Sequence, residues 1–370
     1  MASAGDVHVA ARVRTRSPQK NSLTAGLLWA NSHGVRPSGE RPVRLGDYEL
    51  LERIGIGGMA EVYKARRVGE AGFEQVLAVK RILPHLAADE EFVKMFIDEA
   101  KIAVQLSHPN IAAVHDLGRI DGACFLVLDY VHGRDLRQLW EREREWRAPP
   151  HAGIACHVIA RALEGLSHAH KATDAMGEPL DLIHRDVTPQ NILVSFEGDV
   201  KIVDFGLAKA HGRAHATQAG VVKGKLAYLA PEQVRGKPLD PRVDVYAAGI
   251  VLWELLTGRR LFYSDTDLDT LRKVHAGDVE PPSRLNSVVP PQLDQVVLTA
   301  LAKDADRRFH SAQAFLDALE EVIWDWGVVY RAQQIGAYVA HFFPEARETS
   351  GVVSDESSTV LDEDEFEEIA

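Results

Sequence analysis

The chain has 370 residues, of which 46% are hydrophobic, and this is enough to bury the core of one large domain or two ordinary ones. Its formal net charge is −12 without any basic stripe, which argues against nucleic acid as the main partner because phosphate-backbone binding needs clustered Lys and Arg. We expect no membrane span, since no apolar run approaches the roughly 18–20 residues that one requires. Cys124 and Cys156 lie in apolar stretches, so we expect them to be reduced and the protein to be cytoplasmic.

The two ends of the chain differ from the rest in composition and charge. Residues 1–46 mix Ser, Pro, Gly and Arg without sustained periodicity and predict a disordered basic leader. Residues 345–370 carry clustered Asp and Glu with Ser and Thr, and predict an acidic disordered tail. Any regulatory protein partner is expected to bind through these tails.

The first ordered part is expected to begin near Asp47 and to end at residue 131. Short β-like runs at 48–54, 61–66 and 76–82 precede a helical pattern at 90–106, and two more runs follow at 111–117 and 125–131. The prediction is a small, mostly antiparallel sheet that carries one helix.

The second ordered part, residues 134–325, is predicted to be larger and mainly helical. Apolar residues recur every three and four positions at 154–170, 243–257, 266–275, 292–302 and 312–324, with short strands at 192–195 and 201–203. A hinge is expected near 131–133, and a further helix within 326–344. The fold class is therefore α+β, with a sheet-rich lobe followed by a helical lobe.

A glycine-rich stretch lies between the first two predicted strands, where residues 54–62 read I-G-I-G-G-M-A-E-V. Gly55, Gly57 and Gly58 fall in a hairpin turn, where the backbone can approach a polyphosphate without interference from Cβ atoms. Taken alone, the pattern fits an ordinary glycine-rich hairpin as well.

Lys80 lies on the third predicted strand within A-V-K, and Glu99 lies on the following helix within F-I-D-E-A-K-I. Apolar neighbours place this lysine toward an interior, where an ammonium group needs an anionic partner. Glu99 is the expected partner, although a charged helix residue is more often a solvated one.

Three short motifs follow in order: H-R-D-V-T-P-Q-N at 184–191, D-F-G at 204–206 and A-P-E at 230–232. Each triplet occurs by chance in unrelated proteins, but their ordered occurrence does not. Over about residues 48–325 the chain resembles the eukaryotic-like (Hanks-type) bacterial Ser/Thr protein kinases. The resemblance implies the two-lobed protein kinase fold and transfer of the γ-phosphate of ATP to Ser or Thr hydroxyls of protein substrates.

The resemblance also implies a role for each matching residue. Lys80 would contact the α- and β-phosphates and be fixed by Glu99, while Asp186 would accept the proton of the substrate hydroxyl or orient it. Asn191 and Asp204 would hold Mg²⁺, or Mn²⁺, between the phosphates. The other expected ATP-binding positions, besides the three glycines, are Ile54, Val62, Ala78, Asp129, Val131, Asp135 and Leu193.

Two of these positions have a second interpretation or a departure. Asp135 matches the position that commonly meets the ribose, but an Asp at the start of a helix is equally a cap. The third glycine of the phosphate loop in these kinases is Ala60 here, which adds one methyl group.

Further residues are implied to be structural. Glu232 should pair with Arg308, and Asp244 should anchor the backbone of the catalytic loop, residues 184–191. These signatures favour a protein substrate, because small-molecule phosphotransferases with a kinase-like core generally lack them.

Regulation is predicted to act through Thr217, the only Ser or Thr between Gly206 and Ala230. Phosphorylation of this threonine would add a charge of about −2 that Arg185 and Lys209 are placed to receive. We therefore expect autophosphorylation of this loop.

The catalytic loop departs from its relatives at Thr188, where such kinases usually carry Lys, and Lys225 stands where they usually carry Thr. We hypothesise that Lys225 supplies the missing ammonium while the Thr188 hydroxyl takes over a hydrogen bond to the Asp186 region. Two alternatives stay open: Lys225 faces solvent and selects acidic substrates, or the chain is a pseudokinase scaffold that binds nucleotide or a partner without turnover.

Overall fold

The computed structural model describes residues 43–69, 72–120, 122–205 and 224–345, except for the side chain of Glu99. The described residues divide into two units, the first made of 43–104 and 113–130, the second of 105–112 and 131–345. In this described part of the chain, none of the helices is long and apolar enough to cross a membrane.

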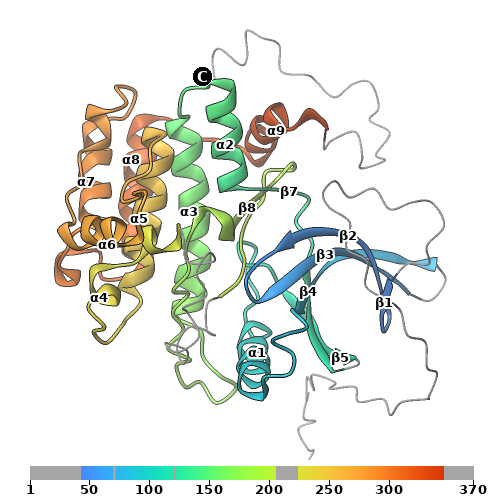
Figure 1. Ribbon diagram of the computed structural model, residues 1–370. Helices are drawn as coiled ribbons and strands as arrows, with labels where there is room; N and C mark the ends of the chain where they lie inside the picture. The colour runs from blue at the N-terminus through green and yellow to red at the C-terminus, as the bar shows by residue number, and fades with distance from the viewer. Residues whose placement is uncertain (1–42, 70–71, 121, 206–223, 346–370) are drawn as a thin grey trace, which may run out of the picture. The chain divides into compact units, whose positions relative to one another are not determined.

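The first unit is an antiparallel sheet with one helix, as predicted (Figure 1). Its strands follow the spatial order β1-β2-β3-β4-β6-β5, and every neighbouring pair is antiparallel. The ordered part begins before Asp47, because β1 pairs with β2 through Val43 and Leu50. The elements are β1 Val43–Leu45, β2 Tyr48–Ile56, β3 Ala60–Val68, β4 Glu74–Ile82, α1 Glu90–Ala103, β5 Val114–Ile120 and β6 Ala123–Asp129.

The alternation of side chains along β6 explains how this sheet is packed. Phe125 and Val127 belong to one buried cluster, formed with residues of β1–β4. Cys124 and Leu126 point the other way and pack with apolar residues of α1. Asp89 precedes the helix as its N-cap, and its carboxylate accepts hydrogen bonds from two backbone N–H groups of the first turn.

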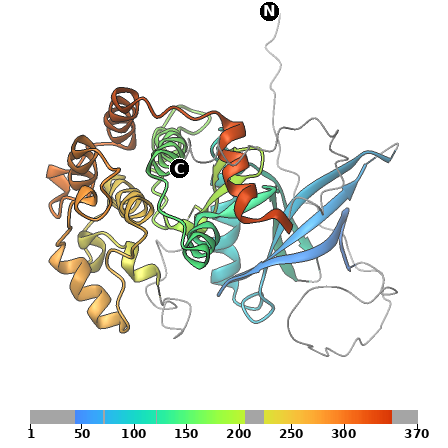
Figure 2. The same ribbon diagram turned by 90° about the horizontal axis from the view of Figure 1, so that it is seen from above.

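The second unit is mostly helical, and α3, α5 and α8 pack against one another within it (Figures 1 and 2). Residues such as Leu163, Tyr246 and Phe315 on these helices are completely buried. The elements are β7 Gly133–Asp135, α2 Leu136–Trp146, α3 Ala152–His170, β8 Ile192–Ser195, β9 Val200–Ile202, α4 Pro231–Val234, α5 Arg242–Thr257, α6 Asp267–Ala276, α7 Pro291–Ala300, α8 Ala312–Trp326 and α9 Ala332–Phe342, with 3₁₀ turns η2 Pro189–Asn191, η4 Lys225–Tyr228, η5 Pro282–Arg284 and η6 Ala305–Arg307.

Helix α2 was not among the predicted helical ranges, although a helix cap at Asp135 was the alternative interpretation of that residue. Its sequence, L-R-Q-L-W-E-R-E-R-E-W, buries only Leu136, Leu139 and Trp140, so the apolar period is masked by charged residues. A capping box starts the helix: the Asp135 carboxylate accepts from the backbone of Gln138, and the Gln138 side chain returns a bond to the backbone of Asp135.

The strand expected at 111–117 begins later, at Val114, and residues 105–112 belong to the second unit. The reason is a competing set of hydrogen bonds with β9. Ala112 N donates to Ile202 O at 2.9 Å, and Ile202 N donates to Asn110 O at 2.9 Å. The Asn110 amide also donates to Val200 O at 2.9 Å, so this segment is held by β9 rather than by the first sheet.

Helix α9 lies within the segment where a further helix was expected, and it packs against α2 and β8 (Figure 1). Gly336 allows the approach, because a Cβ there would collide with the carbonyl oxygen of Phe196. The Tyr338 hydroxyl donates to Glu143 of α2 at 2.8 Å. Burial raises the pKa of Glu143 to about 7.

Candidate active site

The carboxylate of Asp244 at the start of α5 fixes the backbone of the catalytic loop. Asp244 is completely buried, and its two oxygens accept from His184 N at 2.7 Å and from Arg185 N at 2.8 Å. The ring of His170 lies 2.8 Å from the same carboxylate, which can only accept, so the imidazole nitrogen donates. Asp244 therefore anchors the backbone of this loop as expected from the sequence, and the second of its two bonds is to Arg185, the residue before Asp186.

Two residues of this region have left-handed backbone conformations, which are uncommon outside glycine. Arg185 has φ of 63° and Asp204 has φ of 59°. Such conformations persist only where the surroundings hold them, and they cluster at functional sites. The hydrogen bond from Arg185 N to Asp244 supplies that restraint at the first position.

His184 connects the catalytic loop to the segment that contains Asp204. Its Nδ1 accepts from Asp186 N at 3.2 Å, and its Nε2 lies 3.1 Å from the carbonyl oxygen of Val203, to which it must donate. The ring is therefore neutral, and burial lowers the pKa of His184. Its centroid lies 4.5 Å from that of Phe205.

Asp186 and Asn191 are brought together by the short η2 turn. The amide nitrogen of Asn191 donates to the backbone oxygen of Asp186 at 2.8 Å and to its Oδ2 at 3.1 Å. In this orientation the amide nitrogen of Asn191 donates to Asp186, and the amide oxygen is the atom of Asn191 suited to bind a hard cation. The donor chemistry thus fits a magnesium ion held by Asn191 and Asp204.

Lys225 reaches the same carboxylate from η4, with Nζ 2.7 Å from Asp186 Oδ2. The hypothesis that the Thr188 hydroxyl bonds to the Asp186 region is wrong. Thr188 is 1% exposed, and its Oγ1 has no hydrogen-bond partner among the described residues. The acceptor that it was expected to meet is occupied by Asn191 and Lys225 instead.

The regulatory residues are only partly described. Arg185 is half-buried, and its Nε has no hydrogen-bond partner in the part of the chain that the structure describes. Thr217 and Lys209 lie outside the described residues.

The glycine-rich hairpin of the first unit is not crowded by neighbouring atoms at Gly55 and Gly57. Gly55, Gly57 and Gly58 all have negative or extended backbone conformations. A Cβ at Gly55 or Gly57 would come no closer than ordinary van der Waals contact, at 3.8 Å and 3.7 Å. Neither backbone strain nor crowding therefore explains these two glycines, and the hairpin leaves space beside its backbone for a ligand. The methyl group of Ala60 is buried at the start of β3.

Lys80 is half-buried on β4, directly opposite Val62 of β3, and Ala78 on the same strand is buried. The expected ion pair with Glu99 depends on a side chain outside the described residues. Ile54 on β2 is exposed.

A buried carboxylate on β3, opposite Arg81, was missed in the sequence. Glu61 is 3% exposed and accepts from Arg81 at 2.8 Å and from the Tyr63 hydroxyl at 2.9 Å. Burial opposes its ionisation, but these hydrogen bonds and the positive charge of Arg81 together hold the pKa of Glu61 below its usual value. The available signal was the register of two neighbouring predicted strands, which places Glu61 opposite Arg81.

At Asp129, an expected adenine-binding position, the backbone N–H already has a hydrogen-bond partner. Its N–H donates to Ala113 O at 3.0 Å, and its carboxylate accepts from Ala113 N and contacts His115. Its backbone N–H and its carboxylate therefore already have partners within the protein. Val131 is half-buried in the second unit.

Asp135 and Leu193 are paired across β7 and β8, so these two expected nucleotide positions lie side by side. The Asp135 carboxylate accepts from Gln138 N at 2.9 Å, which shows the cap that was the alternative interpretation. Burial raises the pKa of Asp135 to about 6.

The expected pair of Glu232 and Arg308 is present and is bidentate. Two guanidinium nitrogens of Arg308 lie 2.6 Å and 2.8 Å from the two oxygens of Glu232. The Arg308 side chain is completely buried, and its guanidinium carbon lies 4.5 Å from the ring centroid of Tyr246. The pair therefore ties the A-P-E segment to the helical core.

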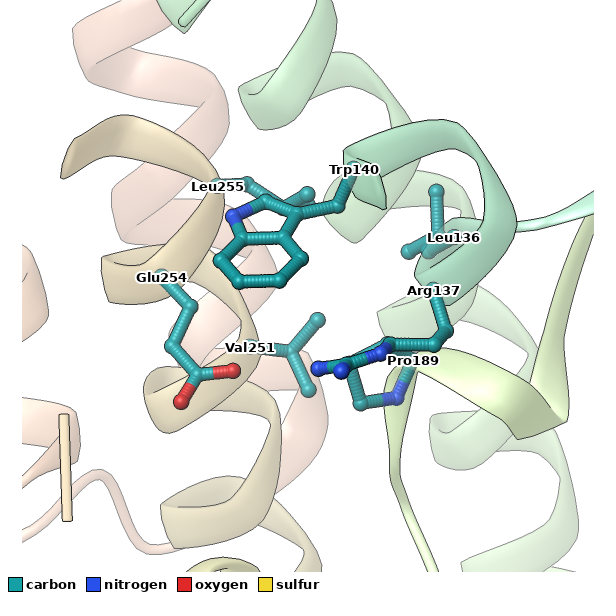
Figure 3. Close-up of a pocket in the computed structure, with 7 residues that line it drawn as sticks. All are labelled: Leu136, Arg137, Trp140, Pro189, Val251, Glu254 and Leu255. Carbon is teal, nitrogen blue, oxygen red and sulfur yellow. The ribbon is translucent and has the colours of Figure 1, made fainter. Parts of the chain in front are cut away.

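A small pocket lies elsewhere in the second unit (Figure 3). The figure shows the indole of Trp140 facing Val251, Arg137 and Pro189 across it. The Nε1 of Trp140 is buried without a hydrogen-bond partner among the described residues. No residue that lines this pocket is a predicted site residue, so it is not the candidate active site. The lining residues are Leu136, Arg137, Trp140, Pro189, Val251, Glu254 and Leu255.

The sequence of this chain is similar to those of known protein kinases. The tyrosine-protein kinase MasK of Myxococcus xanthus is 39% identical over 307 residues, which cover 82% of this chain and 47% of MasK. The serine/threonine-protein kinase PknL of Mycobacterium tuberculosis is 38% identical over 74% of this chain and 65% of its own length. The serine/threonine-protein kinase PrkC of Bacillus subtilis is 34% identical over 72% of this chain and 39% of its own length. The chain thus spans less than two thirds of each of these relatives.

The fold is also similar to a crystal structure, that of the Mycobacterium tuberculosis PknI kinase domain. The TM-score is 0.56 at 28% identity, covering 76% of this chain and 97% of that domain. The model of the protein kinase domain family matches residues 48–318, which include the glycine-rich hairpin, Lys80, Asp186 and Arg308. This chain therefore belongs to the protein kinase domain family.

Proposed function

We propose that the chain transfers the γ-phosphate of ATP to Ser and Thr hydroxyls of protein substrates, with Asp186 as the base. One observation supports this most strongly: the Asp186 carboxylate is held by Asn191 on a loop whose backbone is bonded to the buried Asp244. Phosphoryl transfer needs mainly positioning and charge neutralisation from a protein. A carboxylate fixed in this way is suited to orient a hydroxyl and to take its proton.

The chain's own residues divide the work of the reaction. The backbone of the glycine-rich hairpin and the ammonium of Lys80 would bind the phosphates of ATP. The amide oxygen of Asn191 and the carboxylate of Asp204 would hold Mg²⁺, or Mn²⁺, which when bound neutralises phosphate charge. The substrate oxygen forms a bond to the γ-phosphorus as the bond to the bridging oxygen breaks. The nucleoside diphosphate leaves with that electron pair, and the hydroxyl proton passes to Asp186.

The choice of Ser and Thr over Tyr rests on the resemblance and on two of the relatives. PknL and PrkC are named serine/threonine-protein kinases, whereas MasK is named a tyrosine-protein kinase. A second candidate, a scaffold that binds nucleotide without turnover, is favoured by one observation. Thr188 brings no charge to the catalytic loop and is buried.

One experiment separates these functions. Purified chain is incubated with Mg²⁺, γ-labelled ATP and peptide libraries that offer only Ser, only Thr or only Tyr as acceptor. We expect label on Ser and Thr peptides and its loss in Lys80→Ala, Asp186→Asn and Asp204→Ala, with weaker Mg²⁺-dependent nucleotide binding in the last variant. Label on Tyr peptides alone would refute the acceptor, and nucleotide binding without any transfer would favour the scaffold.

Regulation by autophosphorylation is a further part of the proposal. Arg185 has a half-buried guanidinium whose Nε lacks a partner among the described residues, and a phosphate on Thr217 would give it one. We expect labelled ATP to modify Thr217 and activity to rise with this modification. Full activity in unmodified Thr217→Ala protein would contradict the proposal.

A cytoplasmic location is also proposed. It is supported by Cys124 and Cys156, which are both free and buried, as expected for structural thiols in a reducing compartment.

A further inference from the structure

Lys225 supplies a defined positive charge beside the catalytic base. Its Nζ lies 2.7 Å from Asp186 Oδ2, and the same oxygen accepts from Asn191 at 3.1 Å. The Asp186 side chain is only 10% exposed, whereas that of Lys225 is 42% exposed. Because the Lys225 ammonium is partly open to solvent, its attraction to Asp186 is screened and contributes little to stability, so the pair is better explained by what the ammonium does at this carboxylate.

The neighbouring loop position brings no charge of its own. Thr188 lies two residues from Asp186, but it is buried and its Oγ1 meets no acceptor among the described residues. Lys225 stands at the start of η4, directly after Gly224, whose φ is 109°. That backbone conformation favours glycine and turns the chain so that the lysine begins the 3₁₀ turn near the base.

The chemistry at Asp186 defines the use of such an ammonium. A base must come within about 2.6–3.2 Å of the hydroxyl that it deprotonates. A cation bonded to the same carboxylate therefore lies close to the phosphoryl group while that group moves onto the hydroxyl oxygen. Negative charge is then spread over the equatorial oxygens, and a fixed positive charge stabilises it.

We propose that Lys225 is a catalytic residue of the phosphotransfer, whose ammonium neutralises the phosphoryl group as it is transferred. This inference rests on the proposed kinase function. Lys225 stays protonated throughout; the hydroxyl proton goes to Asp186, and the electron pair of the breaking bond leaves with the nucleoside diphosphate. A flexible lysine stem suits this role, since an ammonium acts as a point charge without a fixed fork geometry.

The first test compares Lys225→Met with Lys237→Met, a control at an exposed lysine of the same unit. We expect Lys225→Met to lower kcat about 100-fold on every peptide, as removal of one transition-state donor does. The KM for ATP stays within about threefold, because the lost interaction forms only in the transition state. Lys237→Met is expected to match the wild type.

The second readout is binding without turnover. Calorimetry measures the affinity for MgADP alone and for MgADP with aluminium fluoride, which mimics the phosphoryl group in flight. Lys225→Met should bind MgADP like the wild type but lose about 100-fold in affinity for the fluoride complex. Lys225→Arg keeps the charge and should lose less, and thermal unfolding of each variant checks its folding.

The third test asks whether a lysine at position 188 can replace Lys225. Thr188→Lys in the Lys225→Thr background should regain at least about tenfold of the lost rate, a coupling that independent sites do not show. The proposal is overturned if Lys225→Met keeps the wild-type rate, becomes faster, or changes only the preference for acidic peptides. A wild-type chain that transfers no phosphate would instead refute the proposed function itself.

Discussion

The pair of Glu232 and Arg308 allows a stability prediction whose size follows from its contacts. Glu232→Ala removes two short charge-assisted hydrogen bonds, of 2.6 Å and 2.8 Å, from a guanidinium that is completely buried. Removing one partner of a buried ion pair costs about 3–5 kcal/mol, because the remaining charge is left uncompensated. Arg308 keeps hydrogen bonds to the carbonyl oxygens of Ala302, Arg242 and Lys303. We therefore expect the lower end, about 3 kcal/mol.

Equilibrium unfolding in urea measures this loss, and a double-mutant cycle tests its cause. Arg308→Met alone should destabilise the protein, but in the Glu232→Ala background it should be neutral or stabilising, because it removes the unpaired charge. Arg272→Ala is the matched control: it breaks an exposed pair with Asp269 and should leave the unfolding free energy unchanged. A cost below about 1 kcal/mol for Glu232→Ala, or simple additivity in the cycle, would refute the reasoning.

Three further predictions concern the second unit. Asp244→Ala leaves two backbone N–H groups of the catalytic loop unpaired, and we expect about 3 kcal/mol of lost stability by urea unfolding, together with a lower kcat. Gly336→Val should detach α9, because its side chain would collide with the Phe196 carbonyl, and hydrogen exchange should then increase in α9 but not in α7. Glu143→Gln keeps an acceptor for Tyr338 but removes a charge, so thermal unfolding across pH reports the titration. The pKa of Glu143 is raised from 4.5 to about 7, hence its stabilising contribution is fully present below pH 4.5, decreases as the pH rises from there, and is lost once the pH has passed about 7. The stability of the variant relative to the wild type should therefore increase between pH 4.5 and about 7 and stay constant above, and an equal difference at pH 4 and pH 8 would contradict the assignment.

The fold could be predicted well wherever the apolar period and the local structure agreed. The strands β2, β3, β4 and β6 and the helices α3, α5 and α8 lie close to their predicted ranges, because each buries a regular face or is buried all round. The range of helix α2 was not predicted, because its charged residues hide a narrow apolar face. The expected strand at 111–117 started too early, since periodicity cannot show that Asn110 and Ala112 pair with β9 instead.

In the candidate site, too, some residues could be predicted from the sequence and others could not. The motifs predicted the family, and the partners of Asp244 and Arg308 are those that the resemblance implied. The hydroxyl of Thr188 was assigned wrongly, because its burial depends on packing that no local pattern shows. The carboxylate of Glu61 was missed for a related reason: a charged residue on a strand is expected to face solvent, and only the strand register places Arg81 opposite it.

The central claim is that Asp186 acts as the base of a phosphotransfer from ATP, and one comparison tests it most directly. The rate of γ-phosphate transfer from MgATP to a Ser/Thr protein substrate is measured for the wild type and for Asp186→Asn, after calorimetry has shown that both bind the nucleotide. The account predicts transfer by the wild type and a loss of at least about 100-fold in the variant, with nucleotide affinity preserved. Equal rates in the two proteins, or no transfer by a wild-type chain that binds MgATP, would contradict it.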